Sequence, residues 1–86
     1  MTRLGDRFQT KIFANCGDGL PQILGRNIRR LRSEKGMSQE ELALETGMKR
    51  SYVSDMERGT RNPSVKALAR LAKALRIEPE ILLRRP

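Results

Sequence analysis

The sequence predicts an all-α domain of five short helices. From Ile23 onward the apolar residues recur at intervals of three and four, which is the spacing of one face of a helix. Glycine, or serine that can cap a helix start, separates most of the periodic runs. The chain has 86 residues, the size of one domain, and only three aromatic residues, so the helices must share one aliphatic core.

The first predicted helix starts near Ile23. Leu24, Ile28 and Leu31 follow at spacings of four and three and form one apolar stripe. Gly36 is expected to end the helix, because glycine readily adopts the left-handed conformation found after helix ends.

The second predicted helix is preceded by Ser38. Ser38 and Glu41 have the spacing of a capping box, in which each side chain bonds the backbone of the other residue. Met37 and Leu42 have the spacing of a hydrophobic staple around this cap. Gly47 should end the helix after about two turns.

The third predicted helix runs from about Arg50 to Glu57 or Arg58 and is ended by Gly59. It has few apolar residues, of which Val53 should face the core. Two helices of this length are marginal in isolation, so packing must hold the second and third helices.

Ser64 is the expected N-cap of a fourth helix, whose apolar positions are Val65, Leu68, Leu71, Ala72 and Leu75. Glu78 and Pro79 are typical of an N-cap followed by a first-turn proline, which predicts a short fifth helix. Together these elements make a compact five-helix domain over residues 23–86.

Residues 1–22 differ from this pattern. They contain several turn-forming residues and few apolar ones, without a sustained period. We interpret them as an N-terminal arm, with at most a short strand at residues 8–14.

The charge balance favours a polyanionic partner. Lys and Arg total 18 and Asp and Glu total 10, which gives a net charge of +8. Nucleic acid is the first candidate and an anionic membrane surface the second. Membrane binding is disfavoured because the apolar stripes are needed for the core and few aromatic residues remain to anchor an interface.

The sequence lacks the residues of common catalytic and metal sites. It has no histidine, and Cys16 is its single cysteine. This excludes an internal disulfide and a Ser–His or Cys–His pair, and it disfavours zinc. We therefore expect no enzyme activity, no metal and no cofactor. The chain has neither a run of roughly 20 apolar residues nor a signal-peptide core, so we expect a cytoplasmic protein.

The third helix has an unusually polar outer face. Its candidate base-reading residues are Lys49, Arg50, Ser51, Ser54 and Asp55. A helix fits the DNA major groove, where arginine pairs with guanine, serine with several bases, and aspartate with cytosine. Ser38, Gln39 and the Tyr52 hydroxyl are candidate phosphate contacts. On periodicity alone, the alternative is an ordinary solvated helix face.

Several motifs in order identify a resemblance. The stretches NIRRLRSEKGMSQEELA, ETGMKRSYVSDMERG and NPSVKALARLAKAL resemble the lambda Cro/repressor-like, Xre-type helix-turn-helix domain. The resemblance covers residues from about Leu24 to Leu83. It implies a lambda-repressor-like fold in which the second and third helices form the helix-turn-helix.

The resemblance also implies roles for individual residues. The base-reading positions of the family fall on Arg50, Ser51 and Asp55, with Lys49 and Ser54 beside them. Other positions correspond to backbone contacts and to an internal ion pair: Gln39 as a backbone clamp, Thr60, Arg61 and Asn62 as phosphate contacts, and Arg32 with Glu57 as the pair. Among the other exposed basic residues, we expect Lys66, near the start of the fourth helix, to contact phosphate.

The chain departs from the family pattern at three places. Lys49 stands at the usual N-cap of the reading helix, where serine or threonine would cap better. Arg76 stands where glycine is common after the fourth helix. The arm of residues 1–22 has no counterpart in the minimal domain.

The function implied is a transcription regulator that binds double-stranded DNA, namely a repressor that acts as a homodimer on a palindromic operator. The expected dimer interface is Ile77, Ile81, Leu82 and Leu83. One alternative is an antitoxin-type interaction module, whose arm would neutralise a toxin or another protein partner. Another is the controller protein of a restriction–modification cluster.

Overall fold

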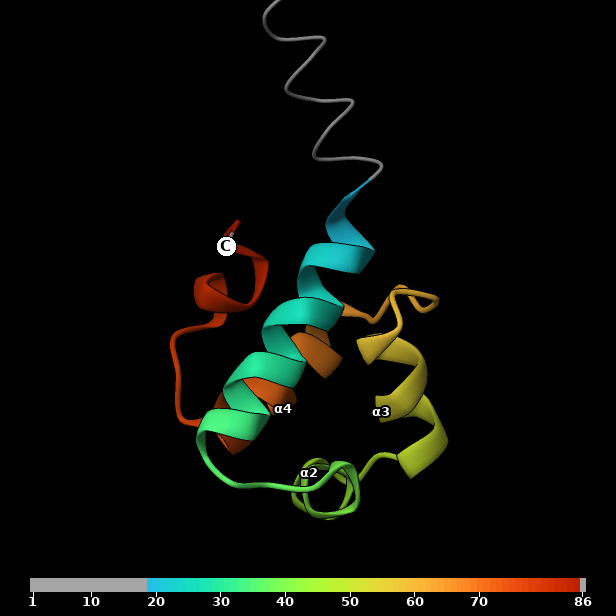
Figure 1. The fold of residues 1–86 in the computed structure, drawn as a ribbon, viewed down its shortest axis with the longest axis vertical. Coiled ribbons are helices and arrows are strands. Elements are labelled where there is room, and N and C mark those ends of the chain that lie inside the picture. The colour runs from blue at the N-terminus through green and yellow to red at the C-terminus, as the bar shows by residue number, and fades with distance from the viewer. Residues whose placement is uncertain (1–18, 86) are drawn as a thin grey trace, which may run out of the picture.

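The structure is a computed structural model that describes residues 19–85 (Figure 1). A first helix covers residues 19–34 within this part. It is followed by α2 (Gln39–Thr46), α3 (Arg50–Glu57), α4 (Val65–Leu75) and the 3₁₀ helix η1 (Pro79–Leu83). The all-α prediction is confirmed for these residues. The fifth element is a 3₁₀ helix, however, because one proline-initiated turn is too short to establish the α-helical hydrogen-bond pattern.

The first helix is already formed at residue 19, before Ile23, where the apolar periodicity begins. Residues 19–22, which were predicted to belong to the arm, are therefore helical. The strand suggested at residues 8–14 and Cys16 lie outside the described residues. The division into an arm and a helix-turn-helix domain stays a prediction.

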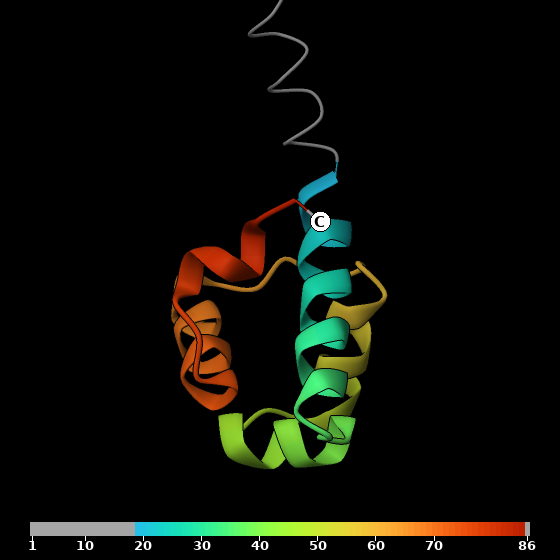
Figure 2. The same ribbon diagram turned by 60° about the vertical axis from the view of Figure 1, so that its left-hand side comes forward.

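The helices enclose one core. Figure 1 shows the first helix crossing in front of α4, with α3 beside it, and Figure 2 shows α2 closing the lower end. The fully buried apolar side chains come from every element: Ile28, Leu42, Val53, Met56, Leu71, Leu75 and Leu82. This arrangement leaves the outer face of α3 free.

Gly25 permits the close contact between the first helix and α3. A Cβ atom at this position would lie 2.4 Å from the carbonyl oxygen of Met56 and 2.6 Å from that of Glu57. Backbone atoms cannot move aside as a flexible side chain can. Glycine is therefore needed here for packing, although it is a poor helix former.

Asn27 holds the C-terminal segment against the first helix. Its buried side-chain amide donates to the carbonyl oxygens of Leu82 at 2.7 Å and Arg84 at 2.8 Å, and more weakly to that of Ile81 at 3.3 Å. These carbonyls lie at the end of η1, where the last carbonyls of a helix lack intrahelical donors; that of Ile81 also accepts from the amide of Arg84 at 3.4 Å. The amide of Asn27 thus caps η1 from a distant part of the sequence.

Arg76 ends α4 in the left-handed conformation, with a φ of 57°. It is the one residue other than glycine with positive φ in the described part of the chain. The absence of glycine at this position therefore leaves a strained C-cap.

Candidate nucleic-acid interface

The N-terminus of α2 is organised by its capping box. The Ser38 hydroxyl accepts from the amide of Glu41 at 3.0 Å, and the Glu41 carboxylate accepts from the amide of Ser38 at 2.7 Å. The Ser38 oxygen is therefore engaged within the helix. Only its hydroxyl proton remains to donate to a phosphate.

Arg32, Glu57 and Gln39 form a network that joins three elements. Arg32 binds both carboxylate oxygens of Glu57, with Nε–Oε2 and Nη2–Oε1 distances of 2.7 and 3.1 Å. Gln39 donates to the same carboxylate at 3.0 Å, and Arg32 also donates to the carbonyl of Met37 at 2.8 Å. The hydrogen bond to Glu57 raises the pKa of the Arg32 guanidinium. The network holds Gln39 in place at the start of α2.

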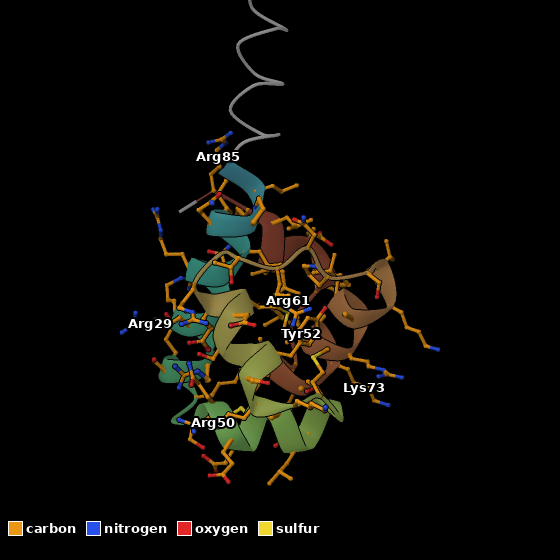
Figure 3. The ribbon with its side chains drawn as sticks, turned by 90° about the vertical axis from the view of Figure 1, so that its right-hand side faces the viewer. Arg29, Arg50, Tyr52, Arg61, Lys73 and Arg85 are labelled. Carbon is orange, nitrogen blue, oxygen red and sulfur yellow. The ribbon has the colours of Figure 1, made fainter. Side chains whose placement is uncertain are left out.

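The N-terminal end of α3 presents its cations without partners. Lys49 is the N-cap, and its side chain makes no capping hydrogen bond. Lys49, Arg50 and Ser51 are exposed, and neither basic side chain is paired with any residue that the structure describes. Figure 3 shows Arg50 at the end of α3 next to α2. This is the end of a reading helix that meets base edges in helix-turn-helix proteins.

Asp55 differs from this pattern because its carboxylate is already occupied. It pairs with Arg58 and, at 3.4 Å, with Arg61. The hydrogen bond from Arg58 is the main cause that lowers the pKa of Asp55. Ser54, like Asp55, is half-buried. No specific role was predicted for Arg58, although it follows Asp55 by three residues at the C-cap of α3.

The loop after α3 is fixed against the helix. The guanidinium carbon of Arg61 lies 5.1 Å from the centroid of the Tyr52 ring (Figure 3), and the Thr60 hydroxyl donates to the carbonyl of Asp55 at 3.0 Å. A cation over an aromatic face is attracted by the ring quadrupole, so Tyr52 orients Arg61. Asn62 and Lys66 are exposed next to this loop.

The predicted dimer interface needs one correction. Leu82 is fully buried in the core of its own domain, so it is unavailable to a second copy. The prediction was wrong for this residue because its side chain is part of the hydrophobic core. Ile77 and Ile81 are half-buried against the same core, and Leu83 is 37% exposed.

Leu83 lies on an apolar surface that η1 shares with α4. Val65 is 83% exposed, the largest value among the exposed apolar side chains described. A hollow of about 420 Å³ lies between these two residues, and its other lining residues are Leu68, Ala69, Pro79 and Glu80. We call this the α4–η1 surface.

Within residues 19–85, no three cysteine, aspartate or glutamate side chains are grouped so that they could hold a metal ion. Over the same residues, none of the helices has the length and apolar character that crossing a membrane requires.

Comparison with known proteins places the chain among helix-turn-helix proteins. The family model described as "Helix-turn-helix" matches residues 28–82. The control protein C.BamHI of Bacillus amyloliquefaciens is 45% identical over 62 residues, which cover 71% of this chain and 76% of that protein.

Solved structures agree with this placement. The restriction–modification controller protein C.AhdI from Aeromonas hydrophila is 48% identical, with a TM-score of 0.70 over 72% of this chain and 94% of the other. The controller C.Esp1396I, solved as a tetramer in complex with its natural 35 base-pair operator, is 35% identical. Its TM-score is 0.67 over 73% of this chain and 83% of the other.

Proposed function

We propose that this chain, which belongs to the Xre/Cro-type helix-turn-helix family of DNA-binding transcription regulators, is a controller protein that binds an operator in double-stranded DNA. Regulators of this family act by binding and not by catalysis. Similarity to C.BamHI, C.AhdI and C.Esp1396I supports the function of a controller protein better than that of a dedicated repressor, which was the first prediction from the sequence.

One observation carries the proposal. Arg50 is exposed at the first position of α3, with no partner among the residues described. In the major groove its guanidinium can donate to both acceptors of one guanine. Lys49 and Ser51 lie beside it, while Ser54 and Asp55 follow along the helix. Asp55 would read cytosine only by sharing its carboxylate with Arg58 and Arg61.

Phosphate contacts would flank this helix. Gln39, held by Glu57, and Ser38 would meet one strand at the start of α2. Arg61, positioned by Tyr52, would meet the other strand. Its neighbours in that contact would be Thr60, Asn62 and Lys66.

A homodimer would double the short reading helix. One α3 covers few base pairs, and helix-turn-helix dimers place two such helices about one turn of DNA apart. The α4–η1 surface, with Val65 and Leu83 at its edges, is the proposed contact between the two copies. By analogy with the C.Esp1396I tetramer in complex with its operator, four copies would bind one operator.

Regulation would follow from occupying a promoter in the cytoplasm and controlling access of polymerase to the genes of a restriction–modification cluster. The antitoxin alternative depends on the arm of residues 1–22, most of which lies outside the described residues. It stays a prediction.

The testing experiment is binding-site selection from a randomised duplex library at roughly 0.15 M salt, where nonspecific attraction is partly screened. We expect enrichment of an inverted repeat, whose two halves the two copies of α3 would read. A match upstream of adjacent methyltransferase and endonuclease reading frames would support the controller function. Weak, salt-sensitive binding without enrichment would contradict it and favour a protein partner.

A further inference from the structure

Two arginines of the first helix have no assigned role. Arg26 and Arg29 are exposed, and neither forms an ion pair or hydrogen bond with any residue in the described part of the chain. The other two arginines of this helix are neutralised, since Arg30 pairs with Glu34 at 3.2 Å and Arg32 pairs with Glu57. The first helix therefore carries two uncompensated positive charges on one side.

These arginines line an open pocket of about 230 Å³ beside the last turn of α3. The other lining residues are Gln22, Glu57 and Arg58. The pocket borders α3 because Gly25 lets the first helix contact the carbonyls at the end of that helix. Its basic side chains thus come from two elements that the fold places side by side.

The pocket continues the contacts expected at the start of α2. Arg29 lies one turn before Arg32, which shares the carboxylate of Glu57 with Gln39. Figure 3 shows Arg29 on one side of α3, and Arg61 with Tyr52 on the other. Basic groups therefore flank the reading helix on both sides.

The chemistry of the pocket favours a polyanion over a small free anion. The pocket is open, it borders the carbonyl end of α3, and the Glu57 carboxylate contributes to its lining, so a single phosphate ion would be held weakly. The backbone of a duplex already bound through α3 would instead bring several phosphates to these arginines without a further loss of translational freedom.

We propose that Arg26 and Arg29 bind phosphates of the operator strand that runs past the first helix. The proposal rests on the proposed function and extends the phosphate contacts of Ser38 and Gln39 from the start of α2 to the first helix, where the family resemblance placed no DNA contact. Phosphate contacts on both sides of α3 fix its orientation in the groove.

The test measures operator affinity as a function of salt for Arg29→Gln, Arg26→Gln and the matched control Arg30→Gln. Each variant loses one positive charge from the same helix, but Arg30 faces Glu34 and not the pocket. We expect each pocket variant to lower the slope of log K against log[salt] by about 0.9, the value for one lost phosphate contact. The control should change it by less than half as much, and no variant should alter the ranking of base substitutions in the operator.

Equal slopes for Arg29→Gln, Arg26→Gln and Arg30→Gln would overturn the phosphate contact while leaving the regulator function intact. If the wild-type protein selects no operator, the same slopes can be measured on a random duplex. A loss of slope confined to the pocket variants would then support the contact although sequence-specific regulation had failed.

Discussion

At the scale of single residues, the start of α3 has a positive charge but lacks a stabilising N-cap. Among the three α-helices whose starts are described, α2 and α4 have serine N-caps that bond the helix backbone, whereas Lys49 leaves α3 uncapped. A cation at a helix N-terminus is also unfavourable for the helix dipole. We expect a phosphate or base contact of Lys49 to compensate for this loss of helix stability.

The substitution Lys49→Ser separates these two effects. We expect it to raise the free energy of unfolding by about 1 kcal/mol, because serine caps the free amides of α3. It should weaken DNA binding at the same time. Urea denaturation and a binding titration on one preparation measure both quantities. The interpretation would be wrong if Lys49→Ser were less stable than the wild type, or if it bound DNA equally well.

Arg50 and Arg61 should differ in the kind of contact that they make. Arg50→Ala should cost about 1–3 kcal/mol per half-site and relax the preference at one base pair, because a bidentate guanine contact is lost. Arg61→Ala should weaken all sequences alike and flatten the salt dependence. Titration against a panel of single-base operator variants distinguishes the two. An unchanged ranking for Arg50→Ala would remove α3 as the reading helix.

At the scale of elements, the contact of the first helix with α3 depends on Gly25. Gly25→Ala should destabilise the protein by about 1–3 kcal/mol, because the added methyl overlaps the carbonyl of Met56. Helix propensity alone predicts the opposite sign. Gly19→Ala is the matched control, since among residues 19–85 a Cβ there would meet only a side-chain atom of Ile23, at 3.9 Å. Thermal unfolding of both variants decides between packing and propensity.

The attachment of η1 depends on Asn27. Asn27→Ala should lower the free energy of unfolding by about 1–3 kcal/mol, because it leaves the buried carbonyl of Leu82 without this donor. Asn62→Ala, an exposed asparagine in the loop before α4, should stay within about 0.5 kcal/mol of wild type. Chemical denaturation measures both. Equal stabilities would show that η1 is held by its apolar contacts alone.

The sequence predicted the elements whose signals are local. Ser38, Glu41 and Gly47 lie within one short stretch, so the bounds of α2 could be derived from capping rules. Asn27 could not be interpreted in this way, because its acceptors lie 54 to 57 residues further along the chain. Leu82 was misplaced because one helical turn has too few residues for periodicity to separate its inner face from its outer face.

The same distinction applies to the interface. The outer face of α3 follows from helical spacing, and exposed Arg50 lies where that spacing predicts. The ion pairs of Asp55 with Arg58 and Arg61 depend on side-chain positions, which sequence spacing does not determine. The pocket at Arg26 and Arg29 depends on the approach of two helices, which only the folded structure defines.

At the scale of the whole molecule, one domain offers two faces with different chemistry. The face around α3 is basic, whereas the α4–η1 surface is apolar and carries the exposed side chain of Val65. A dimer formed through the second face would leave both reading helices free. Such a division of roles predicts that assembly and DNA contact can be changed independently.

Val65→Glu tests the proposed dimer without unfolding the domain. Val65 is the first residue of α4, where a carboxylate is favourable for the helix, so the monomer should remain folded. In an apolar interface the same carboxylate would be desolvated. We therefore expect the Kd of the dimer to rise at least tenfold. Leu44→Glu is the matched control, because Leu44 is 78% exposed on α2, away from this surface. Leu44→Glu should lower the free energy of unfolding by only a few tenths of a kcal/mol, through repulsion with neighbouring glutamates.

Sedimentation equilibrium of the two variants and the wild type, free and with operator, gives the outcome. The α4–η1 surface is the interface if Val65→Glu alone shifts the protein toward monomer and reduces operator occupancy in proportion. Equal effects of the two variants would place the contact elsewhere. The dimer proposal would be wrong if the wild-type protein were monomeric when free and bound as one copy per operator. A single α3 would then have to read the site alone.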